Sequence, residues 1–184
     1  MKTLTLTFVS TLLLIGCLPS SDTPPSPYAG EETRSLKALS DEEINGYLSG
    51  EGMGFAMAAE LNQYPGPKHV LALADDLSLS PEQRTQTEGF FEAMQAEAQR
   101  LGEALVEKER VLDAQFANKE VVADSMKALL HQIGSLRAEI RFAHLQAHLQ
   151  TEAILTDQQI THYNHLRGYG QTDHSAHDHS DHAM

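Results

Sequence analysis

The chain has 184 residues, of which 41% are hydrophobic, and its 26 acidic residues against 13 lysines and arginines give a formal net charge of −13 at pH 7. This acidic balance argues against nucleic acid as a partner and against electrostatic attachment to anionic lipid. With no tryptophan and 6% aromatic residues, the composition favours helices with narrow apolar faces, and the length suits one domain.

Residues 1–16 are predicted to be a lipoprotein signal peptide. Lys2 supplies the positive charge, and the apolar run from Leu4 to Ile15 is too short to span a bilayer. Leu, Ile and Gly then precede Cys17, and this sequence resembles a bacterial lipobox. We therefore expect cleavage before Cys17 and attachment of lipid to its side chain. The alternative is an ordinary signal peptide with an incidental cysteine.

The segment 17–39 is predicted to be a lipidated cysteine followed by a tether. Cys17 is the only cysteine, which excludes an intrachain disulfide and a cysteine-based metal site. Lipidation also accounts for an unpaired thiol in an oxidising compartment. Leu18, rather than Asp, follows Cys17, which under the lipoprotein sorting rules predicts the outer membrane. The next residues are rich in Pro and Ser, a composition that cannot bury a core.

Residues 40–169 are predicted to form one all-α domain. Ser40 and Glu43 have the spacing of a capping box, and a turn containing Pro65 and Pro67 separates two short helices. No segment alternates with period two for long, so no strand is expected. Helices are expected over residues 40–48, 53–61, 67–77, 81–117, 120–154 and 158–167.

The two longest of these segments, 81–117 and 120–154, are expected to pair as a long antiparallel helical hairpin with short flanking helices. Their apolar residues recur every three or four positions, as in a coiled-coil seam. We expect the short helices or a second protomer to cover the apolar residues outside the seam, and we predict a dimer. Those residues are Phe90, Val106, Val111, Val121, Leu130, Phe142, Leu145 and Leu149.

One pentapeptide pattern, Leu-[Ser/Thr]-x-x-Gln, occurs at both ends of the predicted hairpin. In each copy the hydroxyl group can accept a hydrogen bond from the backbone N–H three residues on, while the glutamine reaches back to the N–H of the capping residue. The pattern therefore predicts two helix starts. Its residues are Leu79, Ser80 and Gln83 in the first copy, and Leu155, Thr156 and Gln159 in the second.

The doubled motif, around a helical hairpin and behind an export signal, resembles the LTxxQ family of periplasmic stress proteins. That family includes the Spy and CpxP chaperones, with the zinc-binding ZraP and the metal sensor CnrX as relatives. The resemblance covers about residues 40–169. It implies a curved dimer of two hairpins whose concave face holds unfolded clients without ATP. The acidic balance differs from the basic cradle that those chaperones would have.

The tail, residues 170–184, is rich in histidine and aspartate. His174, His177, His179 and His182 alternate with aspartates in this segment. Imidazole and carboxylate groups at such spacing can bind Zn²⁺, Cu²⁺ or Ni²⁺. The alternative interpretation is a tail that is merely solvated.

A second candidate metal site involves His144 and His148, which lie four residues apart on one predicted helix face. The alternative is a polar face with two exposed histidines, or histidines hydrogen-bonded within the bundle. The metal-sensing relatives place ligands on an early helix and on the helix after the hairpin turn. Met53 and Met57 have the same spacing of four on an early predicted helix, and with Glu60 they offer the complement. Met stands there in place of the relatives' His, which favours copper over cobalt or nickel. Core packing is the alternative for the two methionines.

No phosphate-binding loop, GxSxG, HExxH or HxxEH motif occurs, so we expect no enzyme activity. The sequence predicts a lipid-anchored periplasmic stress protein of Spy/CpxP type that binds Zn, Cu or Ni ions and unfolded protein clients. Two other functions stay open: a dedicated heavy-metal sensor that signals to a membrane partner, and a non-catalytic structural or adaptor lipoprotein.

Overall fold

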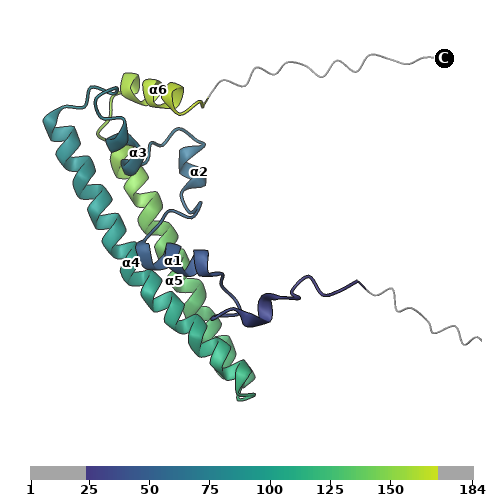
Figure 1. The fold of residues 1–184 in the computed structure, drawn as a ribbon. Coiled ribbons are helices and arrows are strands. Elements are labelled where there is room, and N and C mark those ends of the chain that lie inside the picture. Colours follow the sequence, from purple (N-terminus) through teal and green to yellow (C-terminus); the bar gives the residue numbers. More distant parts are fainter. Residues whose placement is uncertain (1–23, 170–184) are drawn as a thin grey trace, which may run out of the picture. The chain divides into compact units, whose positions relative to one another are not determined.

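The computed structural model describes residues 24–169, and the regular secondary structure in that range is helical, as predicted (Figure 1). The chain divides into two compact units, residues 1–32 and 33–184, and the α-helices found within residues 24–169 all belong to the second. In the described part of the first unit, the Ala29 N–H donates to the Ser26 carbonyl in a turn. The elements are η1 (Glu31–Thr33), α1 (Asp41–Ser49), α2 (Met57–Glu60), α3 (Pro67–Ala72), α4 (Pro81–Ala117), α5 (Ala123–Glu152) and α6 (Asp157–Leu166).

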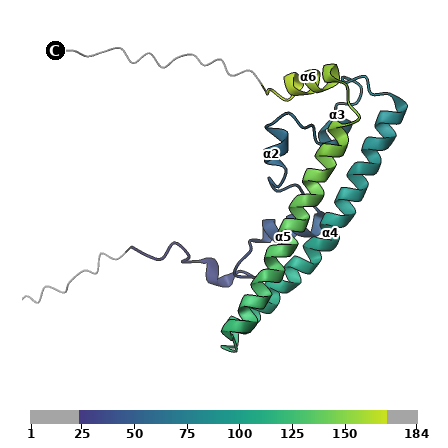
Figure 2. The same ribbon diagram turned by 180° about the vertical axis from the view of Figure 1, so that it is seen from behind.

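Helices α4 and α5 form the predicted antiparallel hairpin and lie side by side in both views (Figures 1 and 2). With 37 residues, α4 is roughly 55 Å long. The second arm begins at Ala123 and not at residue 120. Lys119 has a φ of 58° and Val122 is extended, so the chain does not return to helical geometry until after Val122.

The main core lies along the hairpin seam, where Leu101 and Leu105 of α4 meet Ile133 and Ile140 of α5. Tyr47 of α1 completes this cluster from the side. The seam prediction is therefore confirmed at these positions. Val106, which was predicted to lie outside the seam and to need cover from another element, is buried in the same cluster as Leu36 and Leu39 from the segment before α1.

A buried ion pair also joins the two arms. Glu109 of α4 is 4% exposed, and its Oε1 accepts a hydrogen bond of 3.0 Å from Nη2 of Arg137 on α5. The guanidinium group remains partly in solvent. The carboxylate is thus buried with its charge compensated.

Helix α1 packs against α4 at a glycine. Gly102 is buried, and a Cβ atom there would overlap the carbonyl oxygen of Tyr47. Because Gly102 has no side chain, the backbones of α1 and α4 can approach each other closely at this point. Helix α1 itself begins with the predicted capping box of Ser40 and Glu43.

The two Leu-[Ser/Thr]-x-x-Gln motifs begin α4 and α6, and both predicted capping boxes are present. The structure adds a contact between them, which we call the glutamine clasp. Gln83 Nε2 donates to Gln159 Oε1 at 2.9 Å, and Gln159 Nε2 donates to Gln83 Oε1 at 3.0 Å. The same two amide groups also donate to the carbonyls of Ile154 and Leu77.

The segment between α1 and α3, residues 51–66, is here called the strap. The sequence predicted a helix over 53–61, but α2 covers Met57–Glu60 alone. Met53 and Gly54 have φ angles of 40° and 78°, which are incompatible with a right-handed helix. Similarly, α3 ends at Ala72 and not at the predicted residue 77, and a series of turns follows it.

None of the helices within residues 24–169 is long and apolar enough to cross a membrane. The predicted signal peptide, Cys17 and the histidine-rich tail lie outside the residues that the structure describes.

Candidate metal-binding pocket

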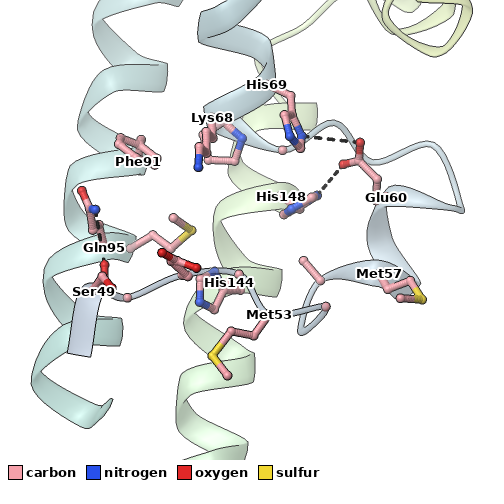
Figure 3. A pocket seen from close by; sticks show the side chains of 18 residues that line it. Ser49, Met53, Met57, Glu60, Lys68, His69, Phe91, Gln95, His144 and His148 are labelled. Atoms are coloured by element: carbon pink, nitrogen blue, oxygen red, sulfur yellow. Dashed lines mark hydrogen bonds and ion pairs between the residues drawn. The ribbon is translucent and has the colours of Figure 1, made fainter. Parts of the chain in front are cut away.

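A pocket of about 360 Å³ lies between the strap and the hairpin (Figure 3). His144 and His148 of α5, Met53 and Met57 of the strap, and Met94 of α4 are among the residues that line it. The sequence reasoning placed the histidines and the strap methionines together, and the structure brings all four to this pocket. Nothing in the sequence pattern distinguished Met94 as a residue of this pocket.

The ring of His148 is fixed in one orientation. Its Nδ1 lies 2.7 Å from the carbonyl oxygen of Tyr64, and because a carbonyl can only accept, Nδ1 carries the proton. A neutral ring then has its lone pair on Nε2. Gly66 packs against this part of the ring, since a Cβ atom there would lie 2.7 Å from Nε2. Sequence reasoning missed both Tyr64 and Gly66 as supports of this histidine.

The ring of His144 is buried, with 3% exposure, and stacks on Phe55 of the strap with a centroid separation of 5.9 Å. Its Nε2 is buried and has no hydrogen-bond partner among the described residues. Burial lowers the pKa of His144 below its usual value, and the neighbouring His148 lowers it further. The imidazole is thus held in the neutral form, which is the form that ligates metal ions.

Glu60, the last residue of α2, connects the strap to α6 and to the segment after it. Its Oε1 accepts hydrogen bonds from Tyr163 at 2.6 Å and Tyr169 at 3.1 Å, and it lies 3.4 Å from Nε of Arg167. Burial and the bond to Glu60 raise the pKa of Tyr163, so its hydroxyl remains a donor. The Oε2 atom of Glu60 lies 3.7 Å from Nδ1 of His148 and has no hydrogen-bond partner in the described part of the chain.

The two strap methionines differ in their surroundings. Met53 is 39% exposed, and its sulfur packs over Gly46 of α1, where a Cβ atom would lie 2.6 Å from it. Met57 is 60% exposed, and its thioether points away from the pocket (Figure 3). Neither methionine belongs to the buried core clusters.

Within residues 24–169, no three or more His, Cys, Asp or Glu side chains are grouped as they would be to hold a metal ion. Glu51, Glu60 and His69 also line the pocket, but among the described residues they are not grouped with His144 and His148 as the ligands of one ion would be. The tail histidines, His174, His177, His179 and His182, lie outside that range.

Comparison with known families gives one match. A family model described as "LTXXQ motif family protein" matches residues 67–167, which run from the start of α3 to the residue after α6. The matched segment contains the glutamine clasp, His144 and His148, while Met53, Met57 and Glu60 lie before it. No curated protein and no solved structure matches the chain.

Proposed function

The chain belongs to the LTXXQ motif family, and on that premise we propose that it is a non-enzymatic periplasmic stress protein of Spy/CpxP type that binds a metal ion. We further propose that Cys17 anchors it to the outer membrane through lipid, that it forms a homodimer, and that the tail histidines bind Zn, Cu or Ni ions. The observation that carries the metal-binding proposal is the pair of imidazole groups in the pocket.

This pair has the chemistry that metal ligation needs. A ligating histidine usually donates its second ring N–H to a carbonyl or a carboxylate, which fixes the tautomer and the direction of the lone pair. The contact between His148 and the Tyr64 carbonyl is of this kind. His144 adds a neutral, buried nitrogen without a partner in the described residues, four positions earlier on the same helix.

The test is a calorimetric titration of Zn²⁺, Cu²⁺, Ni²⁺ and, without oxygen, Cu(I) into the mature protein with its four tail histidines replaced by alanine. We expect about one ion per protomer, and loss of this binding in His144→Ala. His131→Ala is the matched control, because His131 is an exposed histidine on the same helix. Binding that is absent, or that survives in His144→Ala, contradicts a metal site in the pocket.

A second function, binding of unfolded clients without ATP, is favoured by the apolar residues that α5 exposes. Phe142 and Leu149 are 62% and 55% exposed, and both are large side chains on this helix. They lie seven residues apart and so share one face of the helix, and a large exposed apolar face commonly marks an interaction site.

We expect the mature protein to suppress aggregation of a denatured model client, and to do so equally after deletion of residues 171–184. The double variant Phe142→Ser/Leu149→Ser should lose this suppression, because it removes the apolar surface. Gln146→Ser, an exposed polar position on the same helix, should retain it. Equal suppression by the double variant and by this control would place client binding elsewhere or exclude it.

A further inference from the structure

We propose that Met53 is a redox-sensitive modification site, at which oxidation of the thioether to a sulfoxide releases the strap from α1. The proposal goes beyond metal binding and client binding and depends on neither of them. It rests on the access of solvent to Met53, on the packing of its side chain and on the backbone conformation of the strap.

The side chain of Met53 is open to small molecules in water. Within residues 24–169, the exposed methionines are Met53 and Met57, with 39% and 60% exposure. Met53 lines the pocket beside the imidazole pair, and it also lines a second hollow of about 450 Å³ together with Leu61 and Arg141. A small oxidant can therefore reach the thioether, and conversion of methionine to its sulfoxide is a common oxidative change in proteins.

The reaction needs a two-electron oxidant such as hypochlorous acid or a peroxide. With hypochlorous acid, the sulfur gives up two electrons, a sulfur–oxygen bond forms and the oxygen–chlorine bond breaks. Chloride leaves, and the proton goes to water. A methionine sulfoxide reductase reverses the change, because two thiols are oxidised to a disulfide while the oxygen atom leaves as water.

The thioether of Met53 packs directly on the backbone of α1 at Gly46. This glycine is buried, and a Cβ atom there would lie 2.6 Å from Sδ and 3.2 Å from Cε of Met53. Gly46 lies beyond the first turn of α1, so its N–H is bonded within the helix, and its carbonyl already accepts from the N–H of Glu51. A sulfoxide would bring an oxygen atom that needs a donor to a place where the helix backbone has none to offer.

The strap depends on this contact, because its own backbone gives it little stability. Helix α2 is a single turn of four residues, and such a short helix is not stable alone. Met53 has a φ of 40°, in the left-handed region that a residue with a large apolar side chain rarely occupies. Surrounding contacts therefore maintain this turn of the strap.

Release of Met53 would also move the aromatic residue that follows it. Phe55, two positions further on, packs against Tyr47 of α1 and stacks on His144 of α5. When the turn at Met53 relaxes, Phe55 is withdrawn from both rings. Oxidation thus exposes apolar side chains that the strap covers in the reduced protein.

Met57 provides the internal comparison. Its side chain is more exposed than that of Met53, and its thioether points away from the pocket (Figure 3). An oxygen atom added to this sulfur would lie in water and find its hydrogen bonds there. We therefore expect oxidation of Met57 to leave the strap in place.

The test treats the mature protein with a small molar excess of hypochlorous acid. Mass spectrometry of its peptides measures the sulfoxide at each methionine, and hydrogen–deuterium exchange measures the opening of the strap. We expect amide exchange in residues 51–56 to become faster by about tenfold or more once Met53 is oxidised. Exchange within α4 should change little.

Met53→Leu and Met57→Leu form a matched pair of variants. Met53→Leu keeps the apolar volume but cannot form a sulfoxide, so the same treatment should leave exchange in the strap slow. Met57→Leu retains Met53 and should open as the unsubstituted protein does. Met53→Gln, which places a polar group of similar length on Gly46, should open the strap without any oxidant.

Reversal distinguishes a switch from damage. Methionine sulfoxide reductases for both sulfur epimers, supplied with dithiothreitol, should restore the thioether and with it slow exchange in the strap. Exchange that stays fast after the thioether has been restored overturns the proposal. So do a sulfoxide at Met53 with unchanged exchange, opening of oxidised Met53→Leu, a strap that stays closed in Met53→Gln, and a Met53 that resists oxidation while Met57 is fully oxidised.

Discussion

Replacing Gly102 with alanine should lower the free energy of unfolding by about 1–3 kcal/mol. The added methyl group would overlap the Tyr47 carbonyl oxygen, and the clash is with backbone, which cannot rotate away as a flexible side chain does. Helix α1 must therefore shift from α4 and take Tyr47 out of the main core. Urea denaturation followed by circular dichroism measures the loss.

Gly89→Ala is the matched control for this prediction. Gly89 also lies inside α4, but apart from its own chain neighbours and the adjacent helix backbone nothing lies within 4 Å of the position that its Cβ would occupy. Alanine there should raise stability by about 0.5–1 kcal/mol, because it favours the helix and meets nothing. If Gly102→Ala were as stable as Gly89→Ala, the close contact between α1 and α4 would not exist in solution.

The second large effect is expected at the glutamine clasp. Gln83→Ala should cost about 2–3 kcal/mol, because it removes a capping bond, a bond to the Ile154 carbonyl and the two hydrogen bonds with the Gln159 amide. The melting temperature should fall by roughly 2–4 °C for each kcal/mol lost. Gln86→Ala, one turn further along α4 and exposed, should change it little.

A double-mutant cycle separates the clasp from the two caps. Each single variant, Gln83→Ala or Gln159→Ala, leaves the amide of the other glutamine without some of its hydrogen-bond partners. The double variant removes both amides, so neither is left partly unsatisfied. The double variant should therefore lose less stability than the sum of the two single variants, with a coupling of about 0.5–3 kcal/mol. Strict additivity would mean that the two glutamines act as independent caps.

The local parts of this fold could be predicted from the sequence, because their causes are local. Each capping box needs residues three positions apart, and the hairpin seam follows from a period of three and four. The clasp could not be predicted in this way, since 76 residues separate Gln83 from Gln159. The prediction of a helix over 53–61 was wrong for another reason. The apolar spacing suits a helix, but the φ angles of Met53 and Gly54 are incompatible with one.

The difference between features with local causes and features that depend on residues far apart in the chain also applies to the pocket. His144 and His148 share a face because they lie four residues apart within one helix. Met53 and Met57 have the same spacing, yet their side chains diverge, because α2 begins at Met57 and Met53 lies in a turn before it. The partner of His148, the carbonyl of Tyr64, is 84 residues away in the chain, and a backbone group has no signature in the sequence.

The pair of Glu109 and Arg137 has a consequence for how the arms of the hairpin align. An apolar seam of period three and four repeats itself, so sliding α5 along α4 by one turn, about 5.4 Å, would still set apolar residues against apolar residues. That shift would leave the Glu109 carboxylate buried without its guanidinium partner, which typically costs about 3–5 kcal/mol. The buried charge of Glu109 thus favours one register of the hairpin, which the apolar contacts alone would not distinguish from a register shifted by one turn.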